Sequence, residues 1–164
     1  MAPARRSILR YRERMNMDNR TILLVEDNPD DVALTIRALR KSTLVHDLVV
    51  ANDGQEALQY LSGSGEFAGQ GRSTMPRIVL LDLKLPTVSG IETLEKIRAN
   101  WRTRFLPVVI FTSSREEQDI AASYALGANS FIRKPVDFAE FIEMIKCVGA
   151  YWLDYTEPPP QGSI

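Results

Sequence analysis

Short apolar runs alternate along this chain with stretches in which apolar residues recur at helical spacing. Five runs of four to six residues, the first four rich in Val, Ile and Leu, are bounded by polar residues, Gly or Pro, a pattern that predicts strands buried in a parallel sheet. They cover residues 21–26, 48–51, 78–82, 106–111 and 130–133. Two of these runs end in acidic residues.

Helices are predicted after each strand. Asn28 can cap the first, with Pro29 in its opening turn, where Asp30 and Asp31 serve to support the helix at its positive dipole end. Ser89 and Glu92 have the spacing of a capping box for the third helix. The second helix is expected over 54–61 and the last over 138–155, with Pro158 to Pro160 halting it.

The fourth helix has two possible starts. Ser113 with Glu116, or Ser114 with Glu117, can form its capping box, and Gly127 ends it. Strands and helices thus alternate five times, which predicts an α/β fold: one doubly wound, five-stranded parallel sheet with right-handed crossovers and helices on both faces. Residues 62–75 are rich in Gly and Ser and are expected to form a mobile surface loop.

Charge is distributed unevenly. Residues 1–20 carry six arginines against two acidic residues, and the rest of the chain carries a net charge of −5. The acidic body argues against nucleic-acid binding. We expect a flexible basic arm over 1–19, one domain over 20–155 and a Pro-rich tail over 156–164.

Composition also bears on location. No apolar run approaches the roughly 20 residues of a membrane span, and no secretion signal is evident, so we expect a cytoplasmic protein without membrane contact. Cys147 is the sole cysteine, which excludes an intrachain disulfide and a cysteine-based metal site, and we expect it to be a small buried hydrophobe.

Polar residues whose side chains could bind a ligand or take part in a reaction follow the strands. Glu26 and Asp27 close the first strand, Asp82 the third, Thr112 the fourth, and Lys134 follows the fifth. Because the carboxyl ends of parallel strands share one edge, these side chains should meet there. Asp82, at the tip of a buried strand, is expected to stay wet and reactive.

Clustered carboxylates repel one another, and a hard divalent cation relieves this repulsion, so the cluster of Glu26, Asp27 and Asp82 predicts a Mg²⁺ site. Asp is established as a nucleophile that forms acyl phosphates. Lys134 can neutralise arriving phosphoryl oxygens and Thr112 can donate a hydrogen bond to one of them. The set therefore indicates phosphoryl transfer to Asp82.

The chain resembles the receiver domains of bacterial two-component response regulators from Arg20 to about Val148. The motifs that carry the resemblance are LLVEDN (23–28), LLDLKLPTVSG (80–90), FTSS (111–114) and FIRKP (131–135). Within that family it is most similar to single-domain regulators that partner bacterial phytochrome kinases. That narrower similarity rests on EDNPDD (26–31), the Gly-rich loop and YWL (151–153).

The resemblance implies a flavodoxin-like strand order of 2-1-3-4-5 and a switch rather than an enzyme. It implies that Asp82 accepts a phosphoryl group from a sensor histidine kinase, that Glu26 and Asp27 hold Mg²⁺, and that Thr112 and Lys134 contact the phosphoryl group.

Three further positions take roles from the resemblance. Phe131 would be the switch aromatic and the backbone carbonyl of Lys84 a metal ligand. Lys84, two residues after Asp82, departs from the neutral residue common in receivers, and its ammonium could compete with Mg²⁺. Together with the small Ser114 it is expected to tune how long the phosphoryl group persists.

Other function classes fit less well. A phosphatase or dehalogenase with a strand-tip Asp nucleophile needs a second Asp two residues later, where Lys84 stands. A flavin-binding electron carrier would need a Ser/Thr-rich phosphate loop after the first strand, where Asp27, Asp30 and Asp31 would repel phosphate. A receiver-like scaffold that works without phosphorylation is the remaining alternative.

The last predicted helix has more apolar surface than docking on a sheet requires. One face, which includes Phe141 and Ile145, suffices for docking. Met144, Cys147, Val148, Tyr151 and Tyr155 form a second apolar stripe, and with Trp152 they predict a homodimer interface. A deeper groove or a folded-back tail that covers the stripe is the alternative. The downstream target cannot be named from the sequence.

Overall fold

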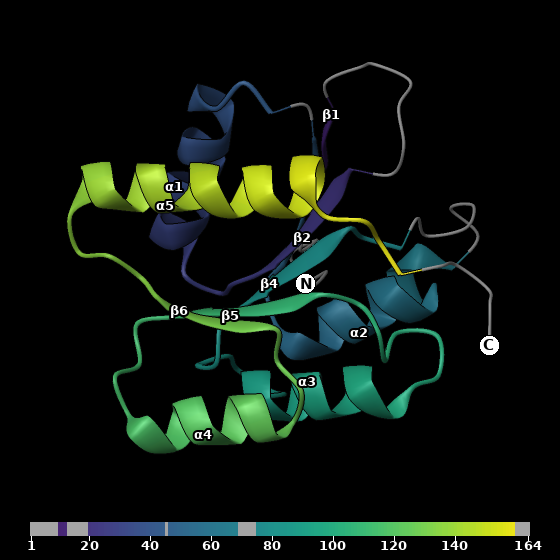
Figure 1. Cartoon of the computed structure of the whole chain (residues 1–164). Coiled ribbons are helices and arrows are strands. Elements are labelled where there is room, and N and C mark those ends of the chain that lie inside the picture. Colours follow the sequence, from purple (N-terminus) through teal and green to yellow (C-terminus); the bar gives the residue numbers. More distant parts are fainter. Residues whose placement is uncertain (1–9, 13–19, 45, 69–74, 160–164) are drawn as a thin grey trace, which may run out of the picture.

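The five predicted strands form one sheet, in which all five run parallel (Figure 1). A computed structural model describes residues 10–12, 20–44, 46–68 and 75–159. The strands lie in the spatial order β3-β2-β4-β5-β6, which is the 2-1-3-4-5 order expected for this sheet. Their bounds are Thr21–Val25 for β2, Asp47–Ala51 for β3, Ile78–Leu81 for β4, Val108–Thr112 for β5 and Ser130–Arg133 for β6.

Helices cover both faces of the sheet, as the alternation of strands and helices predicts (Figure 1). On one face lie α1 and α5, which contact each other, and on the other lie α2, α3 and α4. Their bounds are Pro29–Lys41 for α1, Gly54–Ser62 for α2, Gly90–Ala99 for α3, Glu117–Ala125 for α4 and Phe138–Ala150 for α5.

Alternate residues of each strand point into one of two apolar cores. In β2, Leu23 and Val25 face the core beneath α2 and α3, whereas Ile22 and Leu24 face the core beneath α1 and α5. All four are at most 1% exposed. Burial on both faces explains why these strands are continuous apolar runs, and it leaves the strand ends as the place for polar chemistry.

The N-terminal arm differs in part from the expectation of a flexible segment. Arg10–Arg12 form a short strand, β1, that pairs antiparallel with β3 and extends the parallel sheet at that edge. Without β1, the strand β3 would lie at the edge of the sheet with unpaired backbone N–H and C=O groups, and residues 10–12 pair with these groups. The composition of the arm does not predict this pairing. The rest of the arm lies outside the described residues.

One other segment is more ordered than predicted, and the last helix ends where it was expected. Within the Gly/Ser-rich connection, Gly65–Phe67 form a short 3-10 helix, η1, and the buried Phe67 ring packs edge-on against Tyr60 with centroids 5.4 Å apart. Residues 69–74 of that connection lie outside the described part. The last helix continues beyond α5 as a π-helical segment, η2, over Tyr151–Tyr155. None of the helices in the described ranges has the length and apolar character needed to cross a bilayer.

Candidate functional site

Two neighbouring strands deliver acidic residues to one edge of the sheet. Glu26 follows β2 and donates its N–H to the Ala51 carbonyl of β3 at 2.9 Å, while Asp82 follows β4 and donates its N–H to the Val25 carbonyl at 3.1 Å. These bonds continue the sheet pairing by one residue beyond the strands. The two carboxylates are thereby fixed side by side, as the strand ends predicted.

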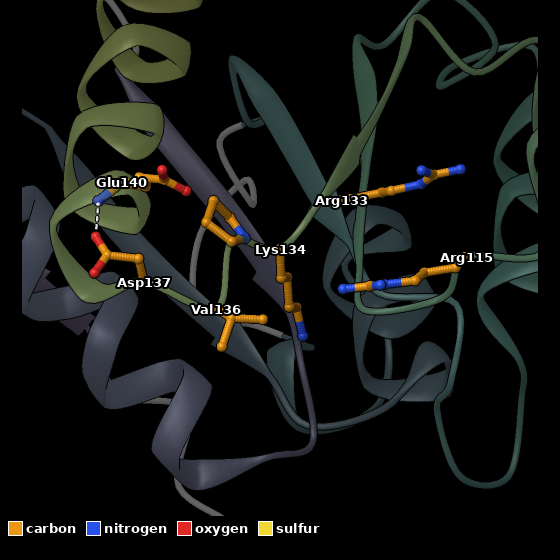
Figure 2. A pocket seen from close by; sticks show the side chains of 7 residues that line it. Arg115, Arg133, Lys134, Val136, Asp137 and Glu140 are labelled. Carbon is orange, nitrogen blue, oxygen red and sulfur yellow. Dashed lines mark hydrogen bonds between the residues drawn. The ribbon is translucent and has the colours of Figure 1, made fainter.

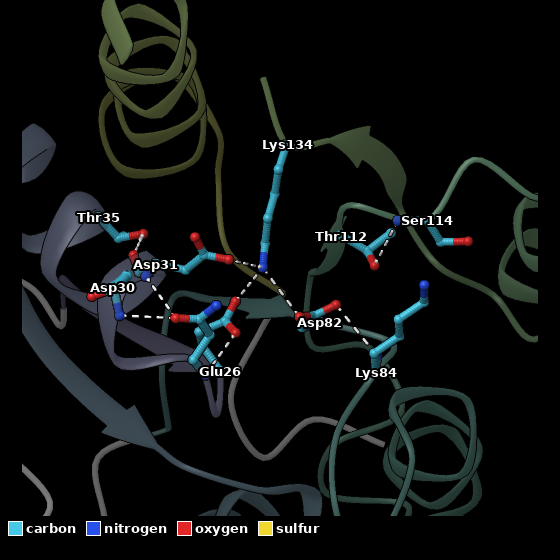
Figure 3. Close-up of polar contacts among 10 residues, drawn as sticks. Glu26, Asp30, Asp31, Thr35, Asp82, Lys84, Thr112, Ser114 and Lys134 are labelled. Carbon is cyan, nitrogen blue, oxygen red and sulfur yellow. Dashed lines mark hydrogen bonds and ion pairs between the residues drawn. The ribbon is translucent and has the colours of Figure 1, made fainter. Parts of the chain in front are cut away.

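Lys134 lies between these carboxylates (Figure 3). Its ammonium donates a short hydrogen bond to Glu26 Oε2, and further ones to Asp31 Oδ2 at 2.8 Å and Asp82 Oδ2 at 3.1 Å. The side chains of Lys134, Glu26 and Asp82 are only 7%, 2% and 8% exposed. Asp82 is therefore paired and mostly buried, and the expectation that it would stay wet at the strand tip is wrong.

Asp31 is the partner that the sequence analysis missed. It was expected only to support the first helix, and the structure does place it in the first turn of α1, where its N–H is within 3.4 Å of the Asn28 side chain. Its carboxylate also contacts Lys134, which is 103 residues away in the chain. The available signal was its position four residues after Asp27, on the turn that faces the strand ends.

The buried ion pair shifts two pKa values. Burial raises the pKa of Glu26 from its ordinary 4.5 to about 7, although the hydrogen bond and charge of Lys134 oppose that rise. Burial also works against the charge on Lys134, but its hydrogen bonds to Asp31 and Glu26 and the charge of Asp82 outweigh burial and raise the pKa of Lys134. Lys134 is thus held in its charged form, whereas burial disfavours the charged form of Glu26.

The oxygens of Glu26, Asp27 and Asp82 can hold a divalent cation. One ligand atom from each lies within 4.8 Å of the other two. Asp27 is exposed, whereas Glu26 and Asp82 are buried. A set of carboxylate oxygens with an opening to solvent fits Mg²⁺ or another hard cation, which binds oxygen and keeps part of its water shell.

Each oxygen of the Asp82 carboxylate has a donor. Oδ2 accepts from Lys134, and Oδ1 accepts the backbone N–H of Lys84 at 3.3 Å. The exposed Lys84 side chain lies on the same side of Asp82 as Thr112 (Figure 3). The Asp82 carboxylate is consequently held in one orientation by its own loop and by Lys134, which follows β6.

The loop after Asp82 folds back upon that residue. Gly90 donates its N–H to the Leu83 carbonyl at 3.0 Å, and a Cβ at this glycine would lie 2.2 Å from the Asp82 carbonyl oxygen. Only glycine permits so close an approach, which the sequence did not reveal. The Ser89 and Glu92 capping box then starts α3 with both of its hydrogen bonds formed, so that prediction is confirmed.

Thr112 is the last residue of β5 and is fully buried. Its carbonyl accepts the Lys134 N–H at 2.8 Å, and its hydroxyl oxygen accepts the Ser114 N–H at 3.3 Å. The strands therefore bring Thr112 beside Asp82 and Lys134 (Figure 3). Among the described residues its side chain makes no hydrogen bond to the carboxylates, and its role toward a phosphoryl group stays a prediction.

Both capping boxes proposed for the fourth helix are wrong. The N-cap of α4 is Glu116, whose side chain makes no capping hydrogen bond. Ser114 is instead turned inward, 2% exposed, where its hydroxyl donates to Asp119 and accepts the Glu116 N–H at 3.3 Å. A buried hydroxyl needs internal partners, and Asp119 on the next helix turn supplies one.

Phe131 on β6 is partly buried and packs against the core beneath α2 and α3. Its backbone N–H donates to the hydroxyl of Tyr124 on α4 at 3.2 Å. The ring thus lies at the margin of the core, a place from which an aromatic side chain can change rotamer. Its part in switching stays a prediction.

A depression of about 760 Å³ adjoins the lysine (Figure 2). It lies beside the turn between β6 and α5, and Val136 there is 93% exposed. Its lining consists of Arg115, Arg133, Lys134, Pro135, Val136, Asp137 and Glu140. Lys134 is shared between this depression and the carboxylate cluster.

The predicted stripe on the last helix divides into two parts. Met144, Val148 and Trp152 are partly buried against the core beneath α1 and α5. Tyr151 and Tyr155 are 56% and 81% exposed. Cys147 is exposed as well, so the expectation that it is a buried hydrophobe is wrong.

Comparison with known proteins assigns the fold and the site to one family. Residues 22–146 match the family model described as response regulator receiver domain. The chain is 35% identical over 140 residues to response regulator Rcp1 from Synechocystis sp., which covers 85% of this chain and 93% of Rcp1. The crystal structure of the Mn²⁺-bound form of Rcp1 aligns with a TM-score of 0.78 over 86% of this chain and 99% of that one.

Two further solved structures are similar. The phosphorylated cyanobacterial phytochrome response regulator RcpA is 37% identical, with a TM-score of 0.79 over 87% of this chain and 99% of that one. The bacteriophytochrome response regulator AtBRR is 44% identical, with a TM-score of 0.69 over 88% and 99%. By its sequence, its strand order and its relatives, this chain belongs to the response regulator receiver domain family and is closely related to phytochrome response regulators.

Proposed function

We propose that this protein is a phosphorylation switch whose acceptor is Asp82. The observation that supports this most directly is the placement of the Asp82 carboxylate, fixed between Lys134 and the Lys84 N–H within an acidic cluster. In the proposed step an Asp82 oxygen forms a bond to phosphorus. The phosphorus–nitrogen bond of a phosphohistidine breaks, and its electron pair stays on the imidazole.

We propose Mg²⁺ as the cation of the site. Asp27 and Asp82 would hold it directly, with Glu26 acting through water and Lys84 through its carbonyl. When bound, Mg²⁺ would offset the negative charge of the phosphoryl oxygens. The donor set and the Mn²⁺-bound form of the relative Rcp1 support a hard divalent cation here.

The donor would be a sensor histidine kinase, and the relatives described as phytochrome response regulators favour a bacteriophytochrome. Such a kinase would act in the cytoplasm, where we place this protein. Output would pass through protein contacts, with no nucleic acid or membrane as partner. The protein would act as a switch with at most self-phosphorylation and self-dephosphorylation.

Acetyl phosphate, with and without a chelator, tests the acceptor. Intact mass spectrometry should show one added phosphoryl group only when Mg²⁺ is present, and Asp82→Asn should show none. The matched control is Asp53→Asn, a buried carboxylate outside the cluster, which should still be modified. Full modification of Asp82→Asn would contradict the proposal. Partner binding that ignores phosphorylation would favour the scaffold alternative.

Thr112 and Lys134 would couple phosphorylation to the conformational change. Their contacts would go to the phosphoryl oxygens, so without them the modified and unmodified states differ less in free energy. Thr112→Ala and Lys134→Ala should therefore still be phosphorylated, but the amide resonances of Phe131 should shift less than in the parent. Equal shifts in variant and parent would contradict these roles.

A homodimer through the C-terminal helix is also proposed. Its support is the exposed pair Tyr151 and Tyr155, since aromatic residues are enriched in interface cores and contiguous apolar surface marks interfaces. Tyr151→Asp should shift the protein to monomer in light scattering at tens of micromolar. Trp101→Asp, at an aromatic on the α3–β5 loop that is 69% exposed, is the control and should stay dimeric. A monomeric parent in both phosphorylation states would refute the dimer.

A further inference from the structure

Lys134 uses all of its donors on carboxylates. An ammonium has three N–H groups, and those of Lys134 face Glu26, Asp31 and Asp82. Glu26 and Asp82 also belong to the cluster that can hold a cation, whereas Asp31 does not. When a cation and a phosphoryl group draw on the other two carboxylates, Asp31 is the partner that remains with the lysine.

The Asp31 carboxylate is well placed to hold that lysine. Its backbone is fixed in the first turn of α1, where its carbonyl accepts the Thr35 hydroxyl at 2.9 Å. Its side chain is 27% exposed, against 2% for Glu26, so it retains its charge at a lower desolvation cost. A rigid helix start therefore presents a charged acceptor to Lys134.

The same contact joins α1 to the turn that precedes α5. Asp31 lies at the start of α1, and Lys134 lies four residues before α5 begins at Phe138. Arg37 of α1 also stacks on the Phe138 ring, with its guanidinium carbon 4.7 Å from the ring centroid. The ion pair thus ties the turn that carries Lys134 to a neighbouring element that lies outside the cation cluster.

We propose that Asp31 is a positioning residue that keeps the Lys134 ammonium directed at Asp82 while the cation and the phosphoryl group occupy the site. This inference rests on the proposed function. It assigns Asp31 a role in coupling rather than in the chemical step, because Asp31 acts only through Lys134.

Asp31→Asn tests the role, with Asp30→Asn as its matched control. Both changes remove one charge from the same helix turn, and the exposed Asp30 side chain makes no ion pair with any described residue. In the phosphorylated protein, the equilibrium constant for the shifted state, read from the amide resonances of Phe131, should fall about three- to tenfold in Asp31→Asn. Asp30→Asn should leave it unchanged.

The Lys134→Met background separates positioning from a general structural effect. There, Asp31→Asn should add nothing, because the group through which it acts is gone. An equal effect in both backgrounds, or an equal effect of Asp30→Asn, would overturn the proposal.

A second measurement needs no phosphorylation. In the resting protein, acetic anhydride should label Lys134 several-fold faster in Asp31→Asn than in the parent or Asp30→Asn, as peptide mapping would show. Unchanged labelling would overturn the positioning role even if Asp82 accepts a phosphoryl group. If Asp31→Asn is labelled faster but the parent is never phosphorylated, the contact of Asp31 with Lys134 is supported and only the proposed switch is refuted.

Discussion

The two ends of the parallel strands differ in the balance between basic side chains and the oxygen atoms that they contact. At the carboxyl ends, which we call the acidic mouth (Glu26, Asp27, Asp31, Asp82 and Lys134), one lysine faces several carboxylates. At the opposite ends Arg20 and Arg77 bind the C-terminal segment 152–156, an arrangement we call the C-terminal clamp. Carboxylates therefore outnumber basic side chains at the acidic mouth, whereas basic side chains outnumber carboxylates at the C-terminal clamp.

The clamp satisfies backbone groups where the last helix stops. Arg77 donates to the carbonyls of Trp152, at 3.2 Å, and Thr156, while Arg20 donates to the Leu153 carbonyl at 3.1 Å and pairs with Asp154. The final carbonyls of a helix have no partner within the helix, so these arginines close its end. This arrangement has no need of a ligand.

The acidic mouth is left with excess negative charge. Burial raises the pKa of Glu26, and the neighbouring charge of Asp82 raises it further. A cation would offset the excess negative charge, and a phosphoryl group would give Lys134 a new partner. The difference between the two ends indicates that imbalance, rather than the number of ion pairs, marks the functional end.

Removing a metal ligand from the acidic mouth should have the largest effect. Asp27→Ala should lower Mg²⁺ affinity by more than about 100-fold, while Glu26→Ala, acting through water, should lower it about tenfold. Isothermal titration calorimetry measures both. Asp30→Ala removes a neighbouring exposed carboxylate and should change affinity less than about twofold. A greater loss in Glu26→Ala than in Asp27→Ala would reverse the assignment.

Breaking the clamp should cost stability without affecting chemistry. Arg77→Met removes two charge-assisted hydrogen bonds to carbonyls and should lower the free energy of unfolding by about 2–3 kcal/mol. Phosphorylation from acetyl phosphate should proceed as in the parent. Arg104→Met, which loses the stacking on the Phe105 ring, is the control and should stay within about 0.5 kcal/mol. Loss of phosphorylation in Arg77→Met would show that the C-terminal clamp also affects the acidic mouth, and it would contradict this separation of roles.

The pH dependence of stability should sharpen the contrast at the acidic mouth. Since folding raises the pKa of Glu26 from 4.5 to about 7, the folded state holds this proton more tightly than the unfolded chain. The resulting stability is fully present below pH 4.5 and is lost as pH rises through about 7.

Glu26→Gln cannot titrate and isolates this effect. Without Mg²⁺, the parent should lose about 3 kcal/mol of unfolding free energy relative to Glu26→Gln between pH 4.5 and 8. Urea unfolding at several pH values measures the difference. A difference that does not change with pH would show that Glu26 has an ordinary pKa.

Local patterns predicted the scaffold well. The strands follow from continuous apolar runs and the Ser89 capping box from residues near in sequence, while the strand order was implied by the family resemblance. The structure confirms all three. The α4 caps failed because Ser114 found a buried partner in Asp119 rather than a helix end. The extra strand β1 was not predicted for a similar reason, since it depends on pairing with β3 rather than on its own pattern.

The sequence predicted every member of the acidic mouth except Asp31, but it did not predict how they connect. Strand ends indicated that Glu26, Asp82 and Lys134 would meet, and they do. Asp31 was missed because a carboxylate in a first helix turn already has a local explanation, and its contact with Lys134 arises only when β6 is placed. Helical and strand periodicity predicts local elements, but it does not predict contacts between residues that lie far apart in the sequence.

Reductive trapping tests the central claim most directly. Borohydride reduces an aspartyl phosphate to homoserine, and peptide mapping locates that residue. After incubation with acetyl phosphate and Mg²⁺, we predict homoserine at position 82 alone, and none when a chelator is added. Trapping at Asp27 or Asp31, or a stable phosphoryl group on Ser or Thr with Asp82 unmodified, would contradict the account.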